Sequence, residues 1–458
     1  MSVTVSAKME GGKVSRVKVH SLLSVVSGSP VAPGKVHILS PLDRAMGHHT
    51  IHIVFYYESN PFKDGPFPLD IDNLRVSLSK LLDEYPIVTG RLTRGAEGGW
   101  QVRCNDAGVR ILQATVNTSM DEWLRSADAS EERDLTLWED MPQDPSYWSP
   151  FRIQINNFEC GALAIGLSCT HMHADMTSAT MLIKSWTEVH SGQPLTHSPI
   201  FNLPPPPSSH GNFVPSFTAL HSPITPANMG TVTMKFSGSV IENCLLQVQS
   251  QCPDATPFDV LVAIFWSRIA RWQEPSFNNH KCSLSICVDS RSAGHPEVPF
   301  GYFGNALHFS VLYVDADKLL SCGLGQVSQY VHSHVAKARA DEFWSVMRWL
   351  DEHSNEGEGP FTIYGPRLTC INMEHMAVAE NGTALMYAAS FKKGERPIHV
   401  SYHVGKVEGQ GLIMVMPSAE GGLARTVTVM LPEEEITNIC KDQTILDLEP
   451  KMIVSGKR

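Results

Sequence analysis

Strand and helix patterns alternate in the first part of the chain. Residues 151–157 alternate apolar and polar side chains, which predicts a half-buried strand. Residues 162–169 are almost all apolar, as in a central strand that is covered on both faces. A helix is predicted to follow and to end at Gly192, because apolar residues recur there at helical spacing. These residues are Met181, Leu182, Trp186 and Val189.

The second part of the chain shows the same alternation. Residues 256–259 (Thr-Pro-Phe-Asp) combine a capping residue, a proline and a carboxylate, and they predict the start of a helix whose apolar face runs over 260–272. Residues 425–431 predict a strand that Pro432 ends, and the acidic residues 433–435 predict the first turn of a closing helix. Strands and helices in both parts predict a mixed α/β fold.

A proline-rich segment separates the two parts. Residues 201–212 contain four consecutive prolines, followed by Ser, Gly and Asn, and such a segment favours extended backbone and turns. We therefore predict an N-terminal domain over 1–200, a crossover linker over 201–215 and a C-terminal domain over 216–458.

Composition narrows the class of protein. Of the 458 residues, 42% are hydrophobic and 18% are charged, which is typical of a globular chain and not of a disordered or coiled-coil one. The net charge of −11 argues against binding to nucleic acid. The ten cysteines are scattered without any C-x-x-C pair, which predicts reduced thiols. No apolar run reaches the length of a membrane span, so we expect a cytoplasmic protein.

Candidate chemistry lies where the strand over 162–169 ends. His171 and Asp175 follow it, and a neutral imidazole there could act as a general base, while the carboxylate could anchor the turn. The simplest alternative is that His171 and His173 are polar residues that merely end a strand. A remote alternative is a zinc metallohydrolase, because residues 170–175 resemble the T-H-x-H-x-D-H motif of metallo-β-lactamase-like hydrolases. Met176 replaces the last histidine, and a thioether is a poor zinc ligand, so we predict no metal.

Three segments in order resemble a known family. His171-x-x-x-Asp175 is followed by Asp289-Ser-Arg291 and then by Tyr302-Phe303-Gly304-Asn305. Together they resemble the H-x-x-x-D, D-x-R and Y-F-G-N segments of the plant BAHD acyltransferases, and the likeness runs from about residue 41 to 436.

Within that family, the likeness is strongest to the Eceriferum and Glossy branch of cuticular-wax proteins. It rests on residues 103–110, 122–124, 160–168 and 361–369. Catalytic BAHD enzymes usually carry D-F-G-W-G in the last of these segments. This chain has Phe361-Thr362-Ile363-Tyr364-Gly365 and keeps only the final glycine.

The family resemblance implies two chloramphenicol-acetyltransferase-like domains, with mixed sheets and covering helices, joined by a long crossover. It places His171 in a solvent channel between them, where it would deprotonate an alcohol or amine acceptor that attacks acyl-CoA. Asp175 would pair with Arg291 and hold the loop, and Tyr302 to Asn305 would lie near the channel. Acyl-CoA would be a co-substrate, and no bound cofactor is implied.

Two functions remain open at this point. The branch resemblance implies an accessory or acyl-handling protein of very-long-chain fatty-acid elongation, which docks on a membrane-bound condensing enzyme at the cytosolic face of the endoplasmic reticulum. The alternative is a soluble acyl-CoA-dependent O- or N-acyltransferase with His171 as general base. The intact histidine motif favours transfer, and the replaced D-F-G-W-G segment argues against it. In either case we expect a monomer.

Overall fold

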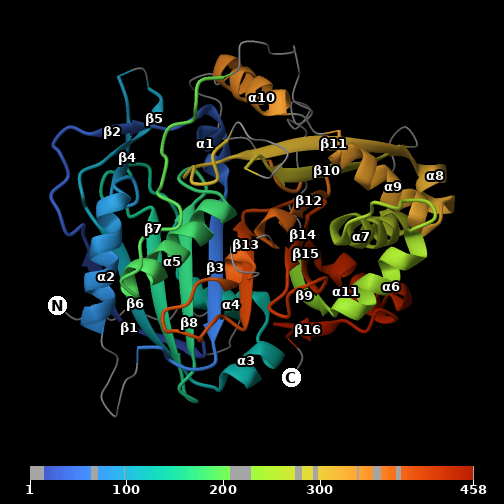
Figure 1. Cartoon of the computed structure of the whole chain (residues 1–458), viewed down its shortest axis with the longest axis horizontal. Helices are drawn as coiled ribbons and strands as arrows, with labels where there is room; N and C mark the ends of the chain where they lie inside the picture. Colours follow the sequence, from blue (N-terminus) through green and yellow to red (C-terminus); the bar gives the residue numbers. More distant parts are fainter. Residues whose placement is uncertain are drawn as a thin grey trace.

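A computed structural model shows two large sheets beside one another (Figure 1). It describes residues 15–62, 71–96, 98–206, 228–273, 281–291, 298–337, 340–353, 363–377 and 383–456. Among these residues, no helix has the length and apolar character that crossing a membrane requires.

The first sheet has six strands in the order β1-β6-β7-β8-β3-β13. Their bounds are β1 (Val17–Val25), β6 (Val109–Val116), β7 (Phe151–Phe158), β8 (Leu163–Thr170), β3 (Thr50–Tyr57) and β13 (His399–Gly405). The last strand comes from the C-terminal part of the chain and pairs antiparallel with β3, from Tyr56 opposite His399 to Thr50 opposite Gly405. The first sheet is therefore completed by a strand that follows the proline-rich segment.

Helices cover both faces of the first sheet. On one face lie α2 (Ile71–Glu84) and α5 (Met176–His190), and on the other lie α3 (Met120–Ser126) and α4 (Ala129–Arg133) with the short helix η2 (Asp134–Thr136). The smaller elements near this sheet are β2 (Val36–Ile38), β4 (Arg91–Arg94), β5 (Trp100–Arg103), α1 (Pro41–Ala45) and η1 (Met46–His48).

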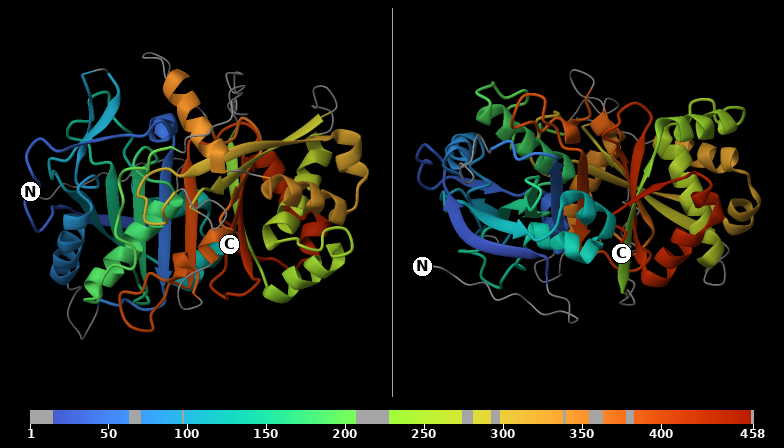
Figure 2. Two further views of the ribbon diagram at one scale, coloured as in Figure 1. Left: turned by 45° about the horizontal axis from the view of Figure 1, so that its top comes forward. Right: turned by 90° about the horizontal axis from the view of Figure 1, so that it is seen from below.

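The second sheet has seven strands in the order β11-β10-β12-β14-β15-β9-β16. Their bounds are β9 (Met229–Phe236), β10 (Lys281–Asp289), β11 (Leu307–Asp315), β12 (Thr369–Asn372), β14 (Leu412–Pro417), β15 (Arg425–Pro432) and β16 (Lys451–Ile453). Its outer face packs against helices at the far side of the molecule (Figure 2). These include α6 (Gly238–Val248), α7 (Pro257–Gln273), α8 (Ala316–Ser321), α9 (Leu324–Val335), α11 (Glu433–Lys441) and α12 (Gln443–Leu446).

One continuous hydrophobic core joins the two sheets. It includes Ile53 and Leu167 of the first sheet together with Phe309 and Met414 of the second. Further elements contact both sheets and their neighbours: α10 (Ala340–His353) packs against α1 and β11, η6 (Glu374–Ala377) against β14, and η8 (Leu385–Tyr387) against α5 and β13. Because the core is shared, residues from distant parts of the chain are brought together where the sheets meet.

Most of the predicted elements are confirmed. Helix α5 begins directly after Asp175, α7 begins at Pro257 with the expected capping bonds between Thr256 and Asp259, and β15 ends at Pro432 before α11. The mixed α/β fold class is confirmed as well. The predicted linker extends into residues that lie outside the described part of the chain, so the domain boundary over 201–215 stays a prediction.

The predicted half-burial of the strand over 151–157 is wrong. Strand β7 is buried along almost its whole length, because η2 and the residues next to it cover its polar face. Gln154 Nε2 donates to the carbonyl of Asp134 at 2.8 Å, and Asn156 Nδ2 donates to that of Leu135 at 3.0 Å. On β8, a side chain at Gly166 would place its Cβ 2.0 Å from the Leu135 oxygen, so glycine allows this close approach.

Candidate active site

The backbone of His171 is held at the end of strand β8. Its N–H donates to the carbonyl of His49 at 3.1 Å, and its own carbonyl accepts from Asn305 Nδ2 at 2.7 Å. The residue before it, Thr170, pairs with Thr50 at the start of β3. The position of His171 is thus fixed by two sheet strands and by the Tyr302–Asn305 segment.

The His171 side chain contacts a tyrosine from the altered D-F-G-W-G segment. Its Nε2 lies 3.1 Å from the Tyr364 hydroxyl, and the two rings are stacked with centroids 5.7 Å apart. Both residues are 0% exposed. The family resemblance implies a histidine that opens onto a solvent channel, whereas here the imidazole is enclosed and its Nε2 already has a hydrogen-bond partner.

Burial keeps both partners of this contact uncharged. Burial lowers the pKa of His171 to about 4, although the nearby Asp175 acts in the opposite direction. Burial also raises the pKa of Tyr364 well above its ordinary value. At neutral pH a neutral imidazole therefore meets a neutral phenol, and the imidazole retains the capacity to accept a proton.

His49 holds the segment that carries Tyr364. Its Nδ1 lies 3.2 Å from the carbonyl of Gly405, which can only accept, so Nδ1 carries the proton. Its Nε2 is then the acceptor for the backbone N–H groups of Ile363 at 3.2 Å and Tyr364 at 3.5 Å. His49 thus anchors the Tyr364 backbone on the side next to His171.

Gly365 fixes the same segment from the other side. Its φ of +102° lies in a region that side chains disfavour, and an added Cβ would lie 1.9 Å from the carbonyl oxygen of Glu408. The Gly365 carbonyl accepts from the N–H of Gln410 at 2.7 Å. The one glycine retained from D-F-G-W-G therefore permits a close approach of two backbones. Of the five predicted positions in this segment, Phe361 and Thr362 lie outside the described residues.

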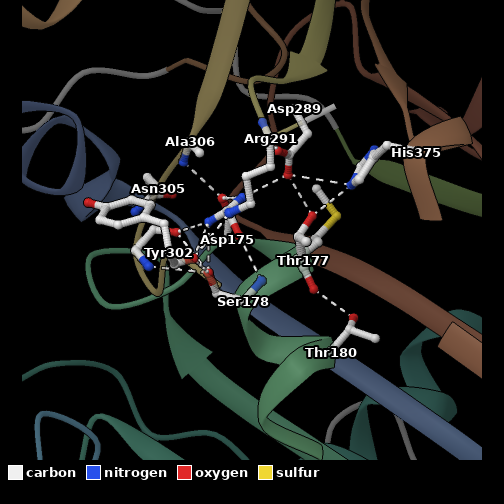
Figure 3. Close-up of polar contacts among 12 residues, drawn as sticks. Asp175, Thr177, Ser178, Thr180, Asp289, Arg291, Tyr302, Asn305, Ala306 and His375 are labelled. Atoms are coloured by element: carbon white, nitrogen blue, oxygen red, sulfur yellow. Dashed lines mark hydrogen bonds and ion pairs between the residues drawn. The ribbon is translucent and has the colours of Figure 1, made fainter. Parts of the chain in front are cut away.

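Both carboxylate oxygens of Asp175 are engaged. Oδ1 accepts from the N–H of Ser178 at 2.8 Å and caps helix α5, while Oδ2 accepts from the N–H of Ala306 at 2.9 Å. Oδ2 also pairs with Arg291 Nη1 (Figure 3), which lies 2.8 Å away. Neither side chain is exposed. Asp175 thereby ties the start of α5 to the segment that follows β10.

Arg291 is the centre of a buried polar network that Figure 3 shows. Its guanidinium also pairs with Asp289 at 2.8 Å and donates to the carbonyls of Tyr302 and Gly304 and to the Ser178 hydroxyl. Burial alone would lower the pKa of Arg291, but the two carboxylates outweigh it and raise that pKa. For the carboxyl group of Asp289, burial alone would raise the pKa. The charge of Arg291 is the main influence that lowers this pKa instead.

The Tyr302–Asn305 segment connects this network to His171. The Asn305 N–H and Nδ2 both donate to Asp43 Oδ1, at 2.9 and 2.8 Å, and Nδ2 also reaches the His171 carbonyl. Phe303 packs edge-on against the Tyr85 ring, with centroids 5.2 Å apart. Gly304 has φ +159°, and a Cβ there would meet the Tyr302 hydroxyl at 2.6 Å. The segment therefore supports the loop that carries His171.

The zinc alternative would use His173 and Asp175 as metal ligands. His173 is buried edge-on against Phe151, with ring centroids 5.5 Å apart, and both oxygens of Asp175 already have partners. In the described part of the chain, no group of three or more His, Cys, Asp or Glu residues is arranged to hold a metal ion.

Sequence reasoning missed several residues of this site. Asp43 could have been noticed, because Ser40 and Asp43 form a capping box at the start of α1. Nothing in the sequence singled out His49. The same holds for Thr177 and His375, which contact each other at 2.8 Å and both approach Asp289.

Comparison with known proteins defines the class of this chain. The model of the Transferase family matches residues 24–446. The chain therefore belongs to this family, the BAHD acyltransferases, as the three motifs indicate.

Individual relatives refine this assignment. The chain is 25% identical over 454 residues to Protein ECERIFERUM 2 of Arabidopsis thaliana, covering 95% of this chain and 99% of that protein. It is 24% identical over 407 residues to a shikimate O-hydroxycinnamoyltransferase of Nicotiana tabacum, covering 85% of this chain and 90% of that enzyme. The chain is thus similar to wax-branch members of the family as well as to acyltransferases.

Solved structures confirm the acyltransferase fold. Vinorine synthase superposes with a TM-score of 0.72 at 19% identity, covering 94% of this chain and 98% of that one. The TRI101 protein of F. sporotrichioides, solved with coenzyme A and T-2, superposes with a TM-score of 0.69 at 14% identity, covering 92% of this chain and all of that one. The predicted pair of chloramphenicol-acetyltransferase-like bodies is therefore the fold of this protein.

Proposed function

We propose that this protein acts in very-long-chain fatty-acid elongation for cuticular wax, as an accessory factor of a membrane-bound condensing enzyme or as an acyl-handling protein. The likeness to Protein ECERIFERUM 2, which extends over 95% of the chain, supports a wax-branch role. In this role the protein acts as a monomer at the cytosolic face of the endoplasmic reticulum, to which its partner recruits it.

The contact between His171 and Tyr364 is the observation that most favours the accessory role. A general base must lie within about 2.6–3.2 Å of the proton that it removes. Here the Tyr364 hydroxyl occupies that position at 3.1 Å from Nε2. An incoming alcohol would have to displace a side chain whose backbone is anchored by His49 and Gly365. A function that does not need His171 as a base fits this closed arrangement.

The alternative function is a soluble acyl-CoA-dependent O- or N-acyltransferase. It is supported by the neutral imidazole of His171, because the unprotonated ring is the form that accepts a proton, and the pKa of about 4 makes this ring a weaker base than an ordinary histidine. His171 would take the acceptor proton, and Asp175 and Arg291 would position its loop. The TRI101 structure that shares this fold holds coenzyme A, which supports acyl-CoA as the co-substrate here. This function requires Tyr364 to leave Nε2.

Fatty-acid profiles of yeast distinguish the two functions. A plant wax condensing enzyme is expressed alone, with the intact protein, or with His171→Ala at matched protein level. The accessory role predicts that both forms lengthen the products equally beyond the condensing enzyme alone. Lengthening by the intact form only assigns a chemical task to His171, and lengthening by neither form contradicts the proposed role.

A further inference from the structure

A cavity of about 520 Å³ opens between the two sheets, at the end of β3 that is remote from His171. Strand β3 runs from Thr50, beside the His171 backbone, to Tyr57 in the cavity wall, a span of roughly 24 Å for eight extended residues. The polar and charged side chains of its wall include Glu58, Lys235, Glu395, Arg396 and Glu420.

Lys235 is the amine in this wall. It belongs to β9 and stands directly opposite Lys451 of β16. Directly opposed residues of antiparallel strands place their side chains on the same face, and two like charges in this arrangement repel each other. The Lys235 ammonium donates to the carbonyl of Ile398 at 3.5 Å, which is the outer limit of a hydrogen bond. The charged form of this side chain is thus poorly stabilised.

The surroundings of Lys235 also favour its neutral form. The pKa of Lys235 falls to about 8, mainly because the side chain is buried and also because the charge of Lys451 is close. The carboxylate of Glu420 acts in the opposite direction and raises this pKa. A neutral amine is a nucleophile, and the cavity gives a small acyl group room to approach it.

We propose that Lys235 is an acyl-accepting amine that is modified by thioesters whose small acyl group enters this cavity. The neutral Nζ attacks the thioester carbonyl, the new C–N bond forms, and the C–S bond breaks. The nitrogen gives up one proton, and the departing thiolate takes up a proton through water, so the products are an amide and a free thiol. The reaction removes one of the two opposed positive charges, and the repulsion between Lys235 and Lys451 ends.

The test uses the full chain with acetyl-CoA at neutral pH and peptide mass spectrometry. Lys235 is expected to be acetylated at least about tenfold faster than the exposed Lys451, because the pKa of Lys235 of about 8, against the ordinary lysine value of 10.5, leaves much more of this amine unprotonated. Equal or slower labelling of Lys235 overturns the proposal. The readout is independent of His171 and of chain elongation.

Two surface substitutions test the cause of the reactivity. Lys451→Gln removes the opposed charge and is expected to slow acetylation of Lys235 several-fold, whereas Glu420→Gln removes the neighbouring carboxylate and is expected to speed it up. Both residues are exposed, and thermal melting confirms that the variants fold. Unchanged Lys235 labelling in both folded variants, or shifts in the reverse directions, overturns the proposal.

Discussion

Replacing the two partners of the buried ion pair should destabilise the protein to different extents. Arg291→Ala leaves two carboxylates, Asp175 and Asp289, without their cation, and removal of one partner of a buried pair typically costs about 3–5 kcal/mol. Asp175→Ala leaves the Arg291 charge still paired with Asp289, so its cost should be smaller. It also removes the cap of α5, which contributes about 1 kcal/mol.

The double variant sharpens this prediction. When Asp175 and Arg291 are both replaced by alanine, the Asp175 charge is no longer buried without a partner, so the loss of stability should be less than the sum of the single losses. Urea unfolding of the four proteins measures these free energies. The exposed pair of Arg125 and Glu122 provides a matched control, because Arg125→Ala should cost less than about 1 kcal/mol. Additive losses, or an Arg291→Ala variant as stable as the control, would refute the reasoning.

Three further predictions concern acid stability, backbone fit and metal. Burial alone would raise the pKa of Glu132, but its pairing with His403 and the hydrogen bonds from Tyr56 and Ser401 together lower that pKa to about 2 from 4.5. About 3 kcal/mol of stability should therefore be present above pH 4.5 and be lost as the pH falls toward 2. Urea midpoints against pH should show this acid loss in the intact protein and a flatter curve in Glu132→Gln. Gly365→Ala should lower the free energy of unfolding by about 1–3 kcal/mol, because the new Cβ would clash with the Glu408 carbonyl and because residue 365 has a φ of +102°. An unchanged melting temperature would contradict this prediction. A strong chelator should leave the melting temperature unchanged, because Asp175 is fully engaged, and a large drop would restore the zinc interpretation.

The elements could be predicted from sequence where local signals suffice. The start of α7 and the end of β15 follow from capping residues and a proline. The burial of β7 could not be predicted, because it depends on η2 lying across the strand through main-chain carbonyls that no side-chain pattern reveals. The addition of β13 to the first sheet likewise depends on pairing across more than 300 residues.

The candidate site was predictable only as far as its motifs. The family motifs predicted His171, Asp175 and Arg291 as residues of the site. The contact of His171 with Tyr364 could not be foreseen, because a substitution in a motif indicates a lost residue and not what the new side chain touches. His49, whose ring nitrogen anchors the Tyr364 backbone, carries no recognisable pattern of its own.

Release of free thiol from acyl-CoA tests the closed arrangement of His171 most directly. The purified protein and its His171→Ala variant are incubated with a long-chain acyl-CoA and an alcohol acceptor, and coenzyme A release and ester formation are followed. Because the Tyr364 hydroxyl holds Nε2, the intact protein should release no more coenzyme A than the variant. Ester formation by the intact protein that falls about a hundred- to ten-thousand-fold in His171→Ala would contradict the account and establish His171 as a working base.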